Sequence, residues 1–199
     1  MPTRRILMAC CLVMPFARAA HAQSPEQALA FVNQTAKQLV GIINGPGSPE
    51  QKRAQLQEVI DRAVAVDQVA QFCLGRFWHT ATPQQRQEYL DLFHRVLLNS
   101  IGGHMGEYHG VSFAVGRAMP GDGGGIAVTS TINRPGQPTA NFTWVIGNEG
   151  GSPKVIDLIV EGTSLRITQR SDYASYLARN SNNVQALLDA MRRQLAAPA

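Results

Sequence analysis

Three segments of the chain share a polar start that is followed by apolar residues three or four positions apart. Each start places a hydroxyl residue before Pro and Gln, at Ser24, Ser48 and Thr82. The hydroxyl caps free N–H groups and Pro fits the first helical turn. The pattern predicts helices from residue 25 to the glycines near 45, from 49 to about 64, and from 83 to a bend or stop before Tyr108. A short helix over 68–75, capped by Asp67, is also expected.

Beyond residue 110 the period of the pattern changes to two. Apolar residues alternate with polar or small ones in 111–116, 126–132 and 140–146, and segment 154–160 is apolar almost throughout. Alternation of this kind is typical of strands with one apolar face. The connections are short and rich in Gly, Pro and Asn, and short links join antiparallel neighbours. We predict an antiparallel meander of about four strands, followed by C-terminal helices.

The order of the elements, helices then strands then helices, indicates an α+β fold. Helices are expected to cover one face of the antiparallel sheet, with one core between the two layers. Residues 23–199 are enough for a single domain with such a core. The apolar pattern describes a filled core and a core that opens around a ligand equally well.

The N-terminal segment has the composition of a secretory signal peptide. Arg4 and Arg5 precede a short apolar run over 6–16, and Ala20-His21-Ala22 has the small residues of a cleavage site. A membrane-spanning helix needs roughly 20 apolar residues, more than this run contains. We expect residues 1–22 to be removed on export. Lipidation at Cys10 is less favoured, because it leaves only about four apolar residues ahead of the cysteine.

Removal of this segment changes the charge and the cysteine content. The count of basic residues falls from 18 to 15 against 14 acidic ones, so the net charge drops to about +1. Nucleic-acid binding through a basic surface thereby loses its main support. Cys73 is the one cysteine left, so no internal disulfide can form, and its apolar neighbours indicate a buried thiol.

Known catalytic and metal-binding patterns do not occur in the sequence. His104 and His109 lack the H-E-x-x-H order, and there is no G-x-S-x-G elbow or phosphate loop. Asp157, Glu161 and Ser164 cluster after the last strand, where paired carboxylates can perform acid–base chemistry. Hydrogen bonds to the backbone of a strand-to-helix corner are the favoured interpretation of this cluster. We expect no catalytic residue, no metal and no cofactor.

Several short motifs occur together in one order. They are Leu74-Gly75-Arg76-Phe77-Trp78, Ala81-Thr82-Pro83-Gln84-Gln85-Arg86, Tyr108-His109-Gly110, Asp157-x-x-x-Glu161-Gly162-x-Ser164 and Arg170-x-Asp172-Tyr173. Their order and spacing resemble the MlaC family, also called the toluene-tolerance family, over nearly the whole mature chain. Gly102-Gly103 within the long helix and the glycine-rich hairpin loops depart from the family pattern. Because of these departures, the resemblance does not define the shape of the pocket or the contacts with partners.

The resemblance implies a monomeric periplasmic carrier that holds phospholipid acyl chains in an apolar pocket between helices and sheet. It also implies exchange of lipid with an outer-membrane lipoprotein complex and with an inner-membrane ABC transporter that carries MCE-type subunits. A hopanoid or another apolar ligand is an alternative cargo. Two further alternatives are a small-molecule enzyme with Asp157 or Glu161 as base, and an adaptor whose solid core has no cavity above about 300 Å³.

The resemblance also indicates where the lipid would lie. Arg170 is expected near the headgroup or in an ion pair with Glu161 or Asp157. The residues expected near the lipid tails are Phe72, Phe77, Trp78, Phe93, Leu97, Phe113, Phe142, Trp144 and Ile159.

Overall fold

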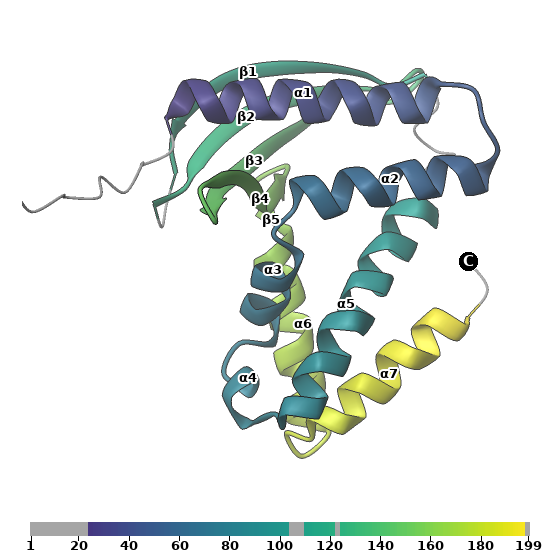
Figure 1. The fold of residues 1–199 in the computed structure, drawn as a ribbon, viewed down its shortest axis with the longest axis vertical. Coiled ribbons are helices and arrows are strands. Elements are labelled where there is room, and N and C mark those ends of the chain that lie inside the picture. Colours follow the sequence, from purple (N-terminus) through teal and green to yellow (C-terminus); the bar gives the residue numbers. More distant parts are fainter. Residues whose placement is uncertain (1–23, 104–109, 122–123, 198–199) are drawn as a thin grey trace, which may run out of the picture.

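A computed structural model describes residues 24–103, 110–121 and 124–197 as an α+β fold (Figure 1). The helices are α1 (Pro25–Asn44), α2 (Pro49–Ala63), α3 (Val66–Leu74), α4 (Phe77–Thr80), α5 (Pro83–Gly103), α6 (Leu165–Arg179) and α7 (Val184–Ala196). The strands are β1 (Ser112–Pro120), β2 (Ile126–Asn133), β3 (Ala140–Glu149), β4 (Ser152–Val160) and β5 (Thr163–Ser164). The predicted fold class is confirmed. The signal segment lies outside the described residues.

The three predicted helix starts are present, each with reciprocal capping. The Ser24 and Ser48 hydroxyls accept hydrogen bonds from the backbone N–H three residues later, and the Gln side chain there accepts one from the cap backbone. Thr82 and Gln85 form the same pair of hydrogen bonds, at 3.1 and 3.2 Å. These local bonds satisfy donors that every helix start leaves free, so the sequence alone predicts them well.

The short helix was placed wrongly by the sequence pattern. It begins at Val66, its cap residue Ala65 makes no side-chain cap, and Asp67 lies in the first turn instead. The reason is tertiary: the Ala65 N–H donates to the Val155 carbonyl at 3.0 Å, and Val64 forms a bridge with Val155. The chain therefore enters α3 directly from a contact with β4.

The strands form one antiparallel sheet in the order β1-β2-β3-β4-β5, which confirms the meander. β5 is a two-residue addition that pairs with the end of β4. Irregular register occurs between Val115 and Ala118 on β1, and between Val145 and Ile146 where β3 pairs with β4. Bulges of this kind increase local twist and change which face a residue occupies.

Figure 1 shows α1 lying along the sheet, while α3, α4, α5, α6 and α7 extend away from it. Two separate clusters of buried apolar residues correspond to these parts. The first packs Ala28 and Val32 of α1 against Val128, Trp144 and Ile146 of the sheet. This sheet cluster is the expected core between layers.

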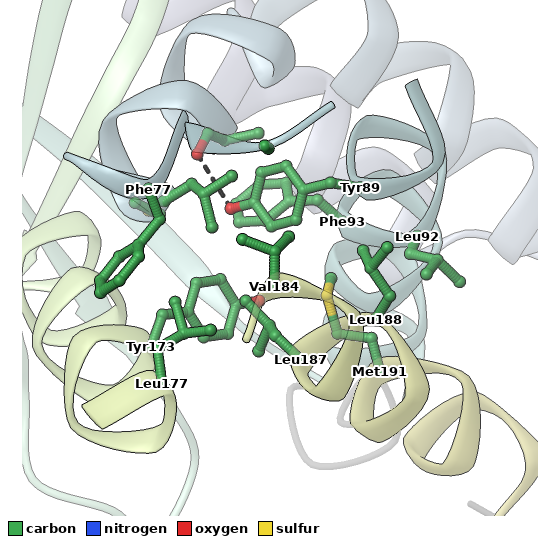
Figure 2. Packing of buried hydrophobic residues seen from close by; sticks show 14 residues of the cluster. Phe77, Tyr89, Leu92, Phe93, Tyr173, Leu177, Val184, Leu187, Leu188 and Met191 are labelled. Carbon is green, nitrogen blue, oxygen red and sulfur yellow. Dashed lines mark hydrogen bonds between the residues drawn. The ribbon is translucent and has the colours of Figure 1, made fainter. Parts of the chain in front are cut away.

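The second cluster is built almost wholly from helices α3 to α7 and is absent from the single-core prediction (Figure 2). Each of these helices has its own apolar stripe, and the stripes bury one another. Tyr89, Leu177 and Leu188 are completely buried in it. The Tyr89 hydroxyl donates to the Ala70 carbonyl at 2.9 Å, so its one polar group is satisfied. We call this set the helical cluster.

None of the helices that the structure describes is both long enough and apolar enough to cross a membrane.

Candidate functional site

An apolar cavity of about 330 Å³ lies where the sheet cluster and the helical cluster meet. Its walls come from α1, α2, α3, α5, α6 and the strands β3 and β4. The lining residues are almost all aliphatic: Leu39, Leu56, Val59, Ile60, Ala63, Val64, Val69, Leu97, Ile101, Trp144, Val155, Ile156, Leu158 and Leu165, with Thr35, Asp157 and Arg166. The volume lies within the range of ligand pockets, about 300–1,000 Å³. The solid core of the adaptor hypothesis is therefore not found.

Helix α2 supplies one wall of this cavity with a single stripe. Leu56, Val59, Ile60 and Ala63 are spaced by three and four residues, are buried, and all line the cavity. The other face of α2 is exposed. Each end of the helix is tied down: the Lys52 ammonium donates to the Ile43 carbonyl at 2.8 Å and contacts α1 there.

The far end of α2 is tied to the sheet. The Lys154 ammonium donates to the Arg62 carbonyl at 2.7 Å, which satisfies a free carbonyl at the end of the helix. At the same end of α2, Asp61 approaches His94 of α5, and the Oδ1 and Nε2 atoms lie 2.7 Å apart. The Nε2 atom has no hydrogen bond of good geometry within the described residues. Helix α2 thus covers the cavity as a separate element held at a few points.

Trp144 forms the wall on the sheet side. Its indole N–H donates to Ser130 Oγ at 3.0 Å, and Ser130 Oγ donates to the Phe142 carbonyl at 3.2 Å. The Phe113 ring meets the indole edge-on, with 5.9 Å between ring centroids. Because these contacts satisfy the indole nitrogen and fix the ring, Trp144 presents an apolar surface to the cavity.

The opening of the cavity has exposed aliphatic side chains. Ile101 near the end of α5 is 39% exposed and Leu165 at the start of α6 is 48% exposed, and both line the cavity. Ile167, two residues further along α6, is 57% exposed but is not one of the lining residues. Large aliphatic residues left in water lose the stabilisation that burial gives, so their grouping at a cavity opening is a functional signal.

The carboxylates suggested as alternative catalytic bases make structural hydrogen bonds. Asp157 is 6% exposed and accepts from Leu158 N at 2.8 Å, Arg166 N at 3.1 Å and Ser164 Oγ at 2.6 Å. Ser164 in turn caps α6. The interpretation of this cluster as a strand-to-helix corner is confirmed for Asp157.

Glu161 has a comparable structural role at the start of β3. Its carboxylate accepts from the Asn141 backbone N–H at 2.5 Å and lies 3.4 Å from the Asn141 side-chain amide. Its own φ of 47° places it in the left-handed region, where the tight turn between β4 and β5 requires it. The exposed carboxylate closes that turn against β3.

Seven of the nine residues expected near the lipid tails divide between three places. Leu97 and Trp144 line the cavity, and Phe113 packs against Trp144 from a shallow groove between α1 and β1. Phe77 and Phe93 are buried in the helical cluster, and Phe72 and Trp78 pack against it. Lipid contact by any of the nine stays a prediction.

The remaining two residues lie on neighbouring strands. Phe142 is half-buried and shares the face of Trp144, because it lies two positions earlier on β3. Ile159 pairs with Thr143 and therefore faces away from Trp144, whereas Leu158 pairs with Trp144 and lines the cavity. Segment 154–160 is apolar on both faces, so the sequence offered no sign of which residue points inward.

Sequence reasoning missed the α2 stripe, the residues at the opening, and Arg166 as members of one site. The α2 stripe was visible as a helical period, but nothing local indicates that its partner surface is incomplete. Arg166 also takes the ion pair that was considered for Arg170: its Nε lies 3.4 Å from Asp157 Oδ2. Arg170 instead stacks on Phe72, with its guanidinium carbon 4.9 Å from the ring centroid.

Titratable groups in the described residues give no sign of a metal or nucleophile site. No group of three or more potential metal ligands occurs among residues 24–103, 110–121 and 124–197. His104 and His109 lie outside these residues. Burial raises the pKa of the Cys73 thiol to about 12, so the reactive thiolate is scarce at neutral pH.

These features define an α+β protein in which a separately held helix covers an apolar cavity beside an antiparallel sheet. Comparison with known families then gives a specific assignment. The model of the MlaC protein family matches residues 23–193, and the chain belongs to this family.

Two individual proteins illustrate the similarity. Toluene tolerance protein ttg2D of Pseudomonas putida is 24% identical over 142 residues, which are 71% of this chain and 66% of the relative. The chain therefore spans a little under two thirds of that protein. A phospholipid-binding protein from Ralstonia solanacearum, solved in complex with a phospholipid, has a TM-score of 0.75 at 23% identity. The match covers 86% of this chain and 99% of that one. It establishes that the two proteins share a fold.

Proposed function

We propose that this protein is a periplasmic lipid carrier that encloses acyl chains in the cavity between α2 and the sheet. The observation that carries the proposal is the cavity itself: about 330 Å³, lined by aliphatic side chains, with Ile101 and Leu165 exposed at its opening. Membership in the MlaC family and the shared fold with a phospholipid-bound protein support a lipid as the occupant. The signal-like segment over 1–22 supports export.

Such a carrier is useful because lipid does not cross water unaided. Two acyl chains contain roughly 30 methylenes, and at about 0.8 kcal/mol each their exposure costs about 24 kcal/mol. An apolar cavity removes that barrier without any catalytic group. The structural hydrogen bonds made by Asp157 and Glu161 favour this carrier over an enzyme that uses either carboxylate as base.

Loading requires the cavity to widen. An apolar cavity of about 150 Å³ holds one benzene ring, so about 330 Å³ encloses only part of two acyl chains. Helix α2 is the element best suited to move, because it lines the cavity with one stripe and is held at its two ends and by the Asp61–His94 contact. Outward movement of α2 would lengthen the cavity toward α5.

The partners follow from the family resemblance. We propose that the carrier exchanges lipid with an outer-membrane lipoprotein complex and with an inner-membrane ABC transporter that carries MCE-type subunits. A hopanoid is the second candidate cargo, because an aliphatic cavity accepts a rigid apolar ring system as readily as flexible chains.

The test is lipid recovery from the mature protein, purified from a Gram-negative host. Native mass spectrometry and lipid extraction should show bound phospholipid, and mixing with phospholipid vesicles should load the remaining protein. Recovery of hopanoid instead would assign the second cargo. Protein without lipid that also takes up none from vesicles would contradict the proposal.

A matched pair of α2 variants separates the cavity from the surface. Ile60→Trp places an indole in the cavity and should abolish loading, whereas Gln55→Trp adds the same group on the exposed face and should load normally. Overpacking costs about 1–3 kcal/mol, so both variants are checked by thermal unfolding. Equal loading of the two variants would place the lipid outside this cavity.

A further inference from the structure

A partly exposed guanidinium lies beside the cavity opening. Arg166 lines the cavity next to the exposed Leu165, and its side chain is only 24% exposed. Its Nε atom is buried and has no hydrogen-bond partner within the described residues. Because that buried atom cannot reach a ligand, an acceptor from outside the chain would meet the exposed quarter of the side chain.

Asp157 holds the buried side of this side chain in an ion pair. It already accepts hydrogen bonds from Leu158 N, Ser164 Oγ and the backbone N–H of Arg166, all at 2.6–3.1 Å. The Arg166 Nε lies 3.4 Å from Asp157 Oδ2, beyond the usual length of a charge-assisted hydrogen bond. Asp157 thus orients the side chain and offsets part of its charge.

A second cation adjoins the first. The guanidinium carbons of Arg166 and Arg170 lie 4.5 and 4.9 Å from the centroid of the same ring, Phe72. They are four residues apart on α6, a spacing at which like charges repel. The shared ring keeps Arg170 close to Arg166, and an anion bound beside them would relieve the repulsion.

We propose that Arg166, supported by Arg170, binds the phosphodiester of the lipid headgroup at the cavity opening. The inference rests on the proposed lipid carrier and goes beyond it, because it assigns the ligand chemistry of the polar end. Guanidinium groups match phosphate oxygens in geometry and charge, and Phe72 fixes their orientation. The acyl chains would then pass Leu165 and Ile101 into the cavity.

The test is competition between two lipids with identical chains. Phosphatidylglycerol and diacylglycerol, both dioleoyl, are offered together in nonionic detergent micelles, and the bound ratio is measured by mass spectrometry. The wild-type protein should prefer phosphatidylglycerol. Arg166→Gln should lower the ratio at least about tenfold, the effect of losing a hydrogen bond to a charged group. Arg166→Lys should give a ratio between those of the wild type and Arg166→Gln, because Lys keeps the positive charge but loses the paired N–H donors of the guanidinium.

Controls distinguish the possible failures. Arg95→Gln removes an exposed arginine on α5 and should keep the wild-type ratio. Diacylglycerol binding reports on folding, because it requires the cavity and not the guanidinium. Protein that binds neither lipid would contradict the carrier itself, whereas binding of both at a ratio unaffected by Arg166→Gln would overturn only the phosphodiester site.

A further experiment distinguishes binding of the lipid headgroup from binding of free phosphate. Added inorganic phosphate should reduce the phosphatidylglycerol preference of the wild-type protein and leave that of Arg166→Gln unchanged. Phosphate binding that depends on Arg166 while the lipid ratio does not would assign the site to free phosphate and overturn the headgroup role.

Discussion

Leu177 and Leu188 in the helical cluster are completely buried, whereas Ile101 and Leu165 stand 39% and 48% exposed beside the cavity. The two regions use the same kinds of side chain, and both derive from helices with apolar stripes. They differ in what faces the stripe. In the helical cluster every stripe meets another stripe, while the α2 stripe meets a surface of β4 and α5 that does not fill the space beneath it.

This difference separates stability from function within one short chain. Filled apolar contacts supply dispersion and the hydrophobic effect, and the helical cluster concentrates them. The walls of the cavity lack part of these apolar contacts, and a bound lipid can supply them. The elements around it are therefore expected to be the easier ones to move.

The largest expected effect on stability comes from truncation within the filled region. Leu188→Ala should lower the free energy of unfolding by about 2–5 kcal/mol, because it leaves a void among rigid neighbours. Urea unfolding measures this. Leu165→Ala at the opening should change it by less than about 0.5 kcal/mol. Similar losses of unfolding free energy for the two variants would contradict the proposed difference between the filled cluster and the cavity opening.

A smaller effect is expected from the buried hydroxyl of Tyr89. Tyr89→Phe removes the hydrogen bond to the Ala70 carbonyl and should destabilise the protein by about 1 kcal/mol. Lipid loading per folded molecule should not change, since Tyr89 belongs to the helical cluster. Altered loading would indicate that the two regions are coupled.

The contact between α2 and α5 should affect movement more than stability. Asp61→Asn changes a contact whose side chains are partly exposed, at 33% for His94 and 45% for Asp61, so the loss of stability should be below about 1 kcal/mol. Uptake from vesicles should become faster if this contact holds α2 closed. Stopped-flow transfer of a fluorescent phospholipid measures the rate, and Asp91→Asn on the outer face of α5 is the control.

The smallest effect at neutral pH is expected from Cys73. Burial raises its pKa to about 12, well above the ordinary value of a thiol, so the folded state resists ionisation. The stabilising contribution is therefore complete below about pH 9 and is lost as the pH rises toward 12. Cys73→Ala should flatten the decline in melting temperature over that range. Rapid labelling of native Cys73 by a thiol reagent at pH 8 would contradict its burial.

Local signals explain why much of the fold was predictable. The capping residues Ser24, Ser48 and Thr82 act within one helical turn, and the alternation in the strands reflects burial of one face. Both signals can therefore be recognised in the sequence. The prediction that Asp67 caps α3 was wrong because the hydrogen bond from Ala65 to β4, a contact distant in sequence, fixes where the helix begins. The two-residue strand β5 and the four-residue helix α4 are too short to produce a period.

The candidate site was predictable only in part. Leu97 and Trp144 were expected in the pocket and do line it, although their contact with lipid is untested. Leu158 rather than Ile159 lines the cavity because the register of β4 against β3 fixes the face, and a shift of one residue exchanges the two faces. Phe77 and Phe93 pack into the helical cluster because α5 meets α7 and α3 meets α6 there.

The sequence by itself determined the family, the α+β class, the helix starts and the meander, because each depends on local capping, periodicity or motif order. Tertiary structure alone decided that the apolar residues divide into two clusters, that a cavity remains between them, and that Arg166 faces its opening. Apolar stripes specify that a surface is buried, but how completely opposing surfaces fit depends on helix placement and strand register, which no single segment encodes.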